Sequence, residues 1–152
     1  MLEKNIYANN ENDTKNIAET LYKISKKGDV FGLSGDMGSG KTTFARYFIQ
    51  KGSKSEIVPS PSYNIYFKYN TKKSAIYHLD AWRLKEATEI LNLGIIEYLE
   101  ESILIVEWPE NINKFLPSNM LTINFTLDEK NRSLFLVGDE EWKKRIKSEL
   151  NG

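Results

Sequence analysis

The sequence contains no cysteine, so disulfide bonds, thiolate metal sites and a cysteine nucleophile are all excluded. It also has no surplus of charge of one sign, because 21 lysines and arginines balance 21 aspartates and glutamates. That balance argues against nucleic acid as the main ligand, since binding to a phosphate backbone usually requires excess positive charge. No apolar stretch approaches membrane-spanning length, and residues 1–5 lack the apolar core of a signal peptide. These absences predict a cytoplasmic protein with no membrane partner.

What the sequence does contain is a complete phosphate-loop motif, G-x-x-x-x-G-K-[ST], at residues 35–42. Residues 29–34 before it predict a buried strand, and residues 43–50 after it predict a helix with an apolar face. In such a loop, glycines let successive backbone N–H groups point at one anion, and the helix adds the positive end of its dipole. Lys41 would reach the β- and γ-phosphates, and the Thr42 hydroxyl would take one position on Mg²⁺. The motif predicts binding of a nucleoside triphosphate.

The remaining strand patterns predict an α/β fold. A helix is expected from Asp13 or Thr14 to Lys27, ended by Gly28. The other expected elements are an edge strand at 4–8, a hairpin of 64–69 with 74–79, a buried strand at 103–106 and a hairpin of 120–127 with 132–138. Consecutive antiparallel strands do not suit the simplest doubly wound sheet. We therefore expect a P-loop NTPase-like three-layer fold with a mixed, mainly parallel central sheet, formed by residues 1–152 as one domain.

Two later segments are expected to be helical. Residues 84–99 have a helical pattern, in two pieces broken at Gly94. The tail from Asp139 presents apolar residues at spacings of four, which are expected to dock on the body of the protein: Trp142, Ile146 and Leu150. Its basic residues fall mostly on the other side and are expected to face solvent: Lys143, Lys144, Arg145 and Lys147.

A phosphate loop needs a second carboxylate at the end of a neighbouring strand, to hold Mg²⁺ or its waters. Glu107 ends the most buried strand, and Asp80 ends a more amphipathic one. Ligands of open α/β sheets lie beyond the carboxyl ends of the strands, which favours Glu107. The alternative for Glu107 is a surface acid at a strand end, and the alternative for Asp80 is a helix N-cap. His78, the only histidine, is expected to be a packed, hydrogen-bonded core residue.

Other residues near these acids have open roles. Trp82 and Trp108 either cover the core, wall the phosphate site from water or present a partner surface. Arg83 would pair with phosphate or with an acid. Ser60 and Ser62 lie in an extended, proline-containing loop that would fold over the γ-phosphate in the manner of a switch.

Together these segments resemble the TsaE (YjeE) family of small bacterial ATPases. The residues that carry the resemblance are 35–43 (GDMGSGKTT), 59–63 (PSPSY), 78–83 (HLDAWR) and 106–109 (VEWP). The phosphate loop alone would be generic, but the other three segments, in this order and spacing, make the match specific. Two positions depart from the family pattern. Ser62 stands where threonine is usual, which keeps the hydroxyl, and Trp82 replaces the usual tyrosine.

The resemblance implies a role in making N6-threonylcarbamoyladenosine at position 37 (t6A37) of tRNAs that read codons beginning with A. It implies that the protein binds ATP and Mg²⁺ and associates with the TsaB–TsaD heterodimer, where ATP hydrolysis resets that complex between turnovers. Contact with tRNA would be only indirect, through the complex. The expected activity is that of a Mg²⁺-dependent ATPase, slow in isolation.

The resemblance also implies residue roles. Thr42 and Glu107 would hold Mg²⁺, and the catalytic residues would be Lys41, Asp80, Glu107 and Trp108. The implied nucleotide-binding residues are Glu11, Met37, Gly38, Ser39, Gly40, Lys41, Thr42, Thr43, Ser62 and Arg132. Among these, Glu11 and Arg132 would lie near the adenine, and Ser62 in the switch-like loop.

Two other functions stay open at this point. A small-molecule kinase would pass the γ-phosphate to a metabolite, but such enzymes usually carry an arginine-rich lid, and the four arginines here are scattered. A non-catalytic module would use ATP only to set its shape. The guanine-specific N-K-x-D motif is absent, which favours ATP over GTP.

Overall fold

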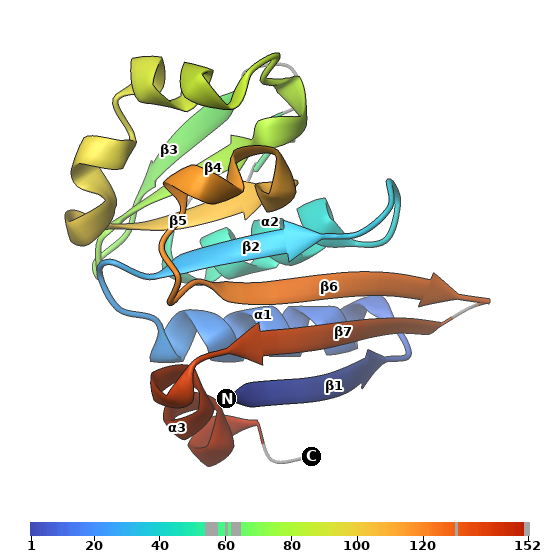
Figure 1. The fold of residues 1–152 in the computed structure, drawn as a ribbon. Helices are drawn as coiled ribbons and strands as arrows, with labels where there is room; N and C mark the ends of the chain where they lie inside the picture. The colour runs from blue at the N-terminus through green and yellow to red at the C-terminus, as the bar shows by residue number, and fades with distance from the viewer. Residues whose placement is uncertain (54–57, 60, 62–64, 130, 151–152) are drawn as a thin grey trace.

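The strands form one sheet whose centre is parallel and whose edges are antiparallel (Figure 1). The computed structural model describes residues 1–53, 58–59, 61, 65–129 and 131–150. The strands are β1 (Leu2–Ala8), β2 (Val30–Ser34), β3 (Tyr66–Asn70), β4 (Ala75–Asp80), β5 (Ser102–Glu107), β6 (Leu121–Asp128) and β7 (Asn131–Gly138), in the spatial order β1-β7-β6-β2-β5-β4-β3. The pairings β6–β2, β2–β5 and β5–β4 are parallel, and the outer three are antiparallel. The expected mixed sheet is confirmed, with parallel pairing confined to its centre.

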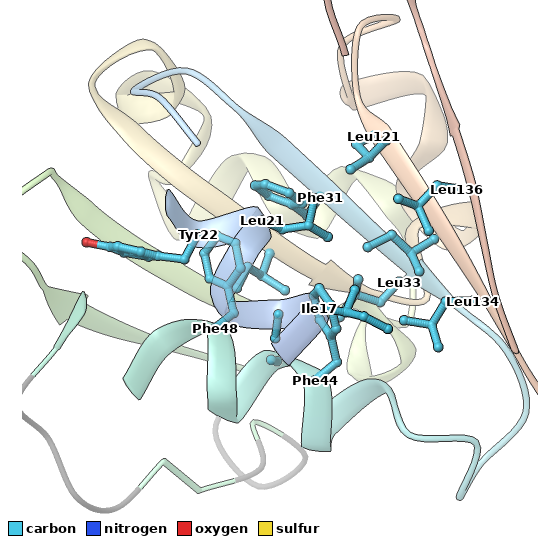
Figure 2. Packing of buried hydrophobic residues seen from close by; sticks show 14 of the residues in the cluster. Ile17, Leu21, Tyr22, Phe31, Leu33, Phe44, Phe48, Leu121, Leu134 and Leu136 are labelled. Atoms are coloured by element: carbon cyan, nitrogen blue, oxygen red, sulfur yellow. The ribbon is translucent and has the colours of Figure 1, made fainter. Parts of the chain in front are cut away.

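The α-helices α1 (Glu11–Ile24), α2 (Lys41–Gly52) and α3 (Glu140–Glu149) pack on one face of this sheet. Figure 2 shows the packing around β2, where Phe31 and Leu33 point toward the aromatic side chains of α2. The ring of Phe31 lies edge-on to Phe48 at 4.8 Å and to Trp142 at 5.2 Å. Because α2 follows the phosphate loop directly, this core fixes the direction in which the loop opens.

The helix boundaries differ from those expected. The first helix begins at Glu11 rather than Asp13 or Thr14, because the side chain of Asn10 caps it by accepting from the Asp13 amide at 2.8 Å. It ends at Ile24, before the expected Lys27. None of the helices in the described part of the chain combines the length and apolar character that a membrane crossing needs.

Short 3₁₀ helices cover the opposite face and form the third layer: η1 (Ala81–Arg83), η2 (Ala87–Leu93), η3 (Ile96–Glu101) and η4 (Pro109–Phe115). The predicted break at Gly94 is confirmed, since that residue ends η2 in the left-handed conformation. Residues 84–99 are helical in two pieces, as expected, but both pieces are 3₁₀ helices rather than α-helices. Their buried anchors are Leu84, Ile90 and Ile95, whose spacings of six and five give no continuous helical stripe.

The C-terminal helix docks as expected, with Trp142 and Ile146 buried. The expectation that Arg145 faces solvent is wrong. Its guanidinium forms two hydrogen bonds with the Asp29 carboxylate, at 2.8 and 3.0 Å, and a third with the Ile24 carbonyl at 2.9 Å. It also lies 3.8 Å from the ring of Trp142. Arg145 therefore ties α3 to the end of α1 and to the turn before β2.

Candidate functional site

The phosphate loop connects β2 to α2, where a strand-to-helix turn is required. Gly35 has φ 139°, and a Cβ there would lie 2.5 Å from the carbonyl oxygen of Phe125, so only glycine fits. Gly38 has φ 79°, and a Cβ there would meet nothing within 4 Å. The loop is thus packed against β6 at its start and open at its crest, where a ligand can approach the backbone.

Lys41 is the first residue of α2, and its side chain lies inside the loop, with 4% of the residue exposed. Its ammonium group donates to the carbonyl of Gly35 and lies 3.4 Å from the centre of the Trp108 ring. Burial lowers the pKa of Lys41 below its usual 10.5, and the nearby carboxylates, Glu107 foremost, oppose that shift. The fold therefore confines a cation where an anionic ligand would relieve its desolvation.

Glu107 lies beside the loop, as its position at the end of β5 predicts. Parallel pairing aligns it with Leu33 on β2 and with Asp80 on β4. Its Oε1 accepts a hydrogen bond from the Thr42 hydroxyl at 2.9 Å, and its Oε2 lies 2.7 Å from Nε2 of His78. The carboxylate is therefore held on both sides and oriented toward the first turn of α2.

Asp80 ends β4, and its carboxylate accepts from the backbone N–H of Trp82 at 3.0 Å. The N-cap interpretation is confirmed, since this contact begins η1. Trp82 is 56% exposed, and its ring lies 4.7 Å from that of Trp108. Trp108 adopts the left-handed conformation, with φ 62°, immediately before Pro109. The two indoles form one wall beside the acids that end β4 and β5.

These residues border a pocket of about 570 Å³ at the carboxyl ends of the central strands. The sequence-predicted site residues that line it are Met37, Gly38, Gly40, Lys41, Thr42, Thr43, Asp80, Glu107, Trp108 and Arg132. The Arg132 side chain lies over Gly40, with its Cδ 3.4 Å from the position of a Cβ there. Residues from four separate segments of the chain thus converge on one cavity.

Of the predicted nucleotide-binding residues, Glu11 and Ser39 do not line this cavity, and Ser62 is not among the described residues. Glu11 begins α1, and its carboxylate pairs with Arg46 at 3.4 Å. It nevertheless lies near the end of the pocket that Arg132 lines, because Arg132 pairs with Ala8 just before α1. Ser62 lies outside the described residues, as does Ser60. The binding and catalytic roles of all the predicted site residues, Glu11 and Ser62 included, stay predictions.

Three further polar residues lie at the site or beside it: His78, Arg83 and Glu110. His78 was expected to be packed and hydrogen-bonded, which is confirmed, but its partner Glu107 was not anticipated. Arg83 lines the pocket, and Glu110 accepts from the Ser34 hydroxyl at 2.9 Å. The sequence feature that indicates a place for His78 near the site is its spacing of two from Asp80, which puts both side chains on one face of β4.

The donor set fits a magnesium–nucleotide complex. Among the described residues no group of three or more histidines, aspartates and glutamates is arranged to hold a metal by itself. Mg²⁺ usually takes only one or two protein oxygens and keeps phosphates and waters as its other ligands, so Thr42 and Glu107 suffice. The buried Ser39 hydroxyl in the loop has no hydrogen-bond partner in the described part of the chain, which suits a phosphate oxygen as acceptor.

Comparison with known proteins agrees with the family resemblance seen in the sequence. The family described as "Threonylcarbamoyl adenosine biosynthesis protein TsaE" matches residues 8–134. The tRNA threonylcarbamoyladenosine biosynthesis protein TsaE of Rickettsia felis is 37% identical over 128 residues, which are 83% of this chain and 74% of that protein. Its namesake in Bacillus subtilis is also 37% identical, over 75% of this chain and 72% of that protein.

A solved structure extends the likeness to the fold. The crystal structure of YdiB from Bacillus subtilis superposes with a TM-score of 0.81, at 27% identity, over 97% of this chain and 93% of that one. The family match, over residues 8–134, includes the phosphate loop and the ends of β4 and β5. The chain therefore belongs to the TsaE family of proteins of tRNA threonylcarbamoyladenosine biosynthesis.

Proposed function

We propose that this protein is a Mg²⁺-dependent ATPase that acts on the TsaB–TsaD heterodimer during t6A37 modification of tRNA. The observation that carries the proposal is the 2.9 Å hydrogen bond between Thr42 and Glu107, next to the buried ammonium of Lys41. A cation, a hydroxyl and a carboxylate at the mouth of a glycine-rich loop are the groups that a phosphoryl-transfer site requires.

Each residue has a defined part in hydrolysis. The loop amides and Lys41 would bind the phosphates of ATP, and Thr42 and Glu107 would hold Mg²⁺. When bound, the metal ion supplies positive charge that stabilises the transferring phosphoryl group. Because Glu107 is assigned to the metal, we assign the orientation of the attacking water to Asp80, at the end of the adjacent strand. Trp108 covers Lys41 and limits the access of bulk water.

The partner assignment depends on the family and on the shape of the pocket mouth. The exposed indole of Trp82 and the neighbouring Arg83 border the pocket and are available to a protein partner. We propose that the TsaB–TsaD heterodimer covers this mouth and that tRNA is reached only through the complex. A cytoplasmic location follows from that pathway.

The test is to measure ATP hydrolysis by the purified protein alone and after addition of the TsaB–TsaD heterodimer. We expect slow turnover alone and faster turnover in the complex, because the heterodimer would supply or position groups that stabilise the transferring phosphoryl group. Lys41→Ala serves as the inactive control. Equal rates with and without the heterodimer would remove the coupling claim.

Two further outcomes separate the competing functions. Transfer of the γ-phosphate to a metabolite rather than to water would favour a kinase. Glu107→Ala distinguishes an ATPase from a binding module. If hydrolysis is abolished while t6A37 formation in the reconstituted system continues unchanged, ATP acts only as a structural ligand.

A further inference from the structure

We propose that His78 is a positioning residue, which orients the Glu107 carboxylate for its work on the metal–nucleotide complex. The two side chains meet at 2.7 Å, between Nε2 of His78 and Oε2 of Glu107. His78 has no exposed surface, and Glu107 is 5% exposed. The contact links β4 to β5 directly beneath the pocket. This inference depends on the proposed function, because it assigns His78 a role in that site.

The strand register explains how this contact arises. His78 pairs with Ile105 across the parallel β4–β5 ladder, and Asp80 pairs with Glu107. Side chains two residues apart on a strand share a face, so His78, Asp80 and Glu107 all project toward the face that α2 covers. On that face, Glu107 is diagonally adjacent to His78, within reach of the imidazole. A shift of either strand by one residue would turn one of the two side chains to the opposite face.

The contact leaves Glu107 little freedom. A carboxylate rotates about its last side-chain bond unless both oxygens are engaged. Thr42 donates to Oε1, and the imidazole holds Oε2, so the plane of the carboxylate is set from two sides. Buried partners of metal-binding carboxylates act in this way, and their loss weakens metal affinity or activity roughly 10- to 100-fold.

The environment of the ring also indicates where its proton lies. Nδ1 of His78 is buried and has no hydrogen-bond partner among the described residues. A hydrogen on Nδ1 would therefore have no acceptor, whereas a hydrogen on Nε2 is donated to Glu107. This arrangement assigns the Nε2–H tautomer, and His78 acts as a fixed donor.

A matched pair of variants tests the proposal. In His78→Gln the side-chain amide can reach the place of Nε2 and donate to Glu107. In His78→Asn an equally polar amide is too short to do so. The measurements are the Mg²⁺ concentration for half-maximal ATPase rate and, independently of turnover, Mn²⁺ binding in the presence of a non-hydrolysable ATP analogue by electron paramagnetic resonance. Binding of ATP in EDTA serves as the metal-free reference.

We expect His78→Asn to weaken Mn²⁺ binding and raise the Mg²⁺ requirement about tenfold or more, with metal-free ATP binding unchanged. His78→Gln should stay within about threefold of the wild type. Wild-type metal binding by His78→Asn would overturn the positioning role. Equal damage in both variants, with metal-free ATP binding lowered to the same extent, would also overturn it and indicate packing alone. If the wild type shows no Mg²⁺-dependent ATP binding, the proposed function itself fails.

A measurement on the unaltered protein does not depend on how the variants fold. The chain has one histidine, so ¹⁵N-labelled histidine gives the signals of one imidazole. We expect a proton on Nε2 that is protected from exchange with solvent, and a shift of its resonance when Mg²⁺ and the ATP analogue are added. A proton found on Nδ1, or signals identical with and without the metal–nucleotide complex, would contradict the proposal.

Discussion

Lys41 occupies a position where the fold disfavours its own charge. Desolvation inside the loop exceeds the attraction of the surrounding carboxylates, so the pKa of Lys41 lies below 10.5. Between that lowered pKa and 10.5 the unfolded chain binds more protons than the folded protein. The free energy of unfolding attributable to this residue therefore rises with pH through that window. A charged Lys41 therefore lowers the stability of the unliganded protein, and the proposed anionic ligand would offset this cost.

The variant Lys41→Met should separate the effect of the Lys41 charge on ligand binding from its effect on stability. We expect ATP affinity to fall roughly 100-fold, because a charge-assisted contact worth about 3 kcal/mol is lost. The free energy of unfolding near neutral pH should equal or exceed that of the wild type, and this difference should shrink as the pH approaches 10.5. Urea unfolding at several pH values and nucleotide titration give both quantities. A variant markedly less stable at neutral pH would refute the argument.

At the scale of elements, the docking of helix α3 depends on one of its basic side chains, that of Arg145. The Arg145–Asp29 ion pair is mostly removed from water, with side-chain exposures of 13% and 11%. A surface ion pair contributes little, but breaking a buried pair leaves an unpaired charge behind. The same guanidinium also donates a hydrogen bond to the carbonyl of Ile24, the last residue of α1.

We expect Arg145→Met to lower the free energy of unfolding by about 2–3 kcal/mol, somewhat less than for a fully buried pair, because both groups keep some contact with solvent. Lys147→Met, on the exposed side of the same helix, is the matched control and should change it by no more than about 1 kcal/mol. Chemical denaturation measures both. Similar losses in the two variants would show that Arg145 makes no special contribution.

The sequence predicts elements best where one local signal dominates. The phosphate loop, the buried β5 strand and the two hairpins follow from glycine spacing and from apolar patterns, and the structure confirms them. The segment after Arg83 was predicted less well, since 3₁₀ turns are selected by packing over β4 and β5 rather than by a period of their own. Arg145 was misplaced because its partner, Asp29, is 116 residues away in sequence.

The candidate site likewise has a part that the sequence predicts and a part that it does not. Lys41, Thr42 and Glu107 were predicted together, because a motif and a strand end both point to the same edge of the sheet. The contact between His78 and Glu107 could not be predicted, since it depends on the relative register of two strands separated by residues 81–101. Register is a property of the assembled sheet, and a single sequence does not specify it.

At the scale of the whole molecule, ligand binding and folding are linked. A ligand that binds only the folded state raises its stability by about 2.7 kcal/mol at a concentration 100 times its dissociation constant. We therefore expect Mg²⁺–ATP to raise the melting temperature of the wild type and of Arg145→Met by similar amounts. Lys41→Met should show little change. Differential scanning fluorimetry measures the shifts, and an equal shift in Lys41→Met would contradict the assigned role of Lys41.

Helix α3 lies at the far end of the sheet from the phosphate loop (Figure 1). Trp142 contacts Phe31 near the start of β2, whereas the loop begins after Ser34 at its other end. Since the chain has no native thiol, Lys147→Cys would create a unique attachment point on the exposed side of that helix. A dye or a biosensor surface coupled there would leave the pocket unobstructed, so nucleotide and partner binding can be followed on an immobilised molecule.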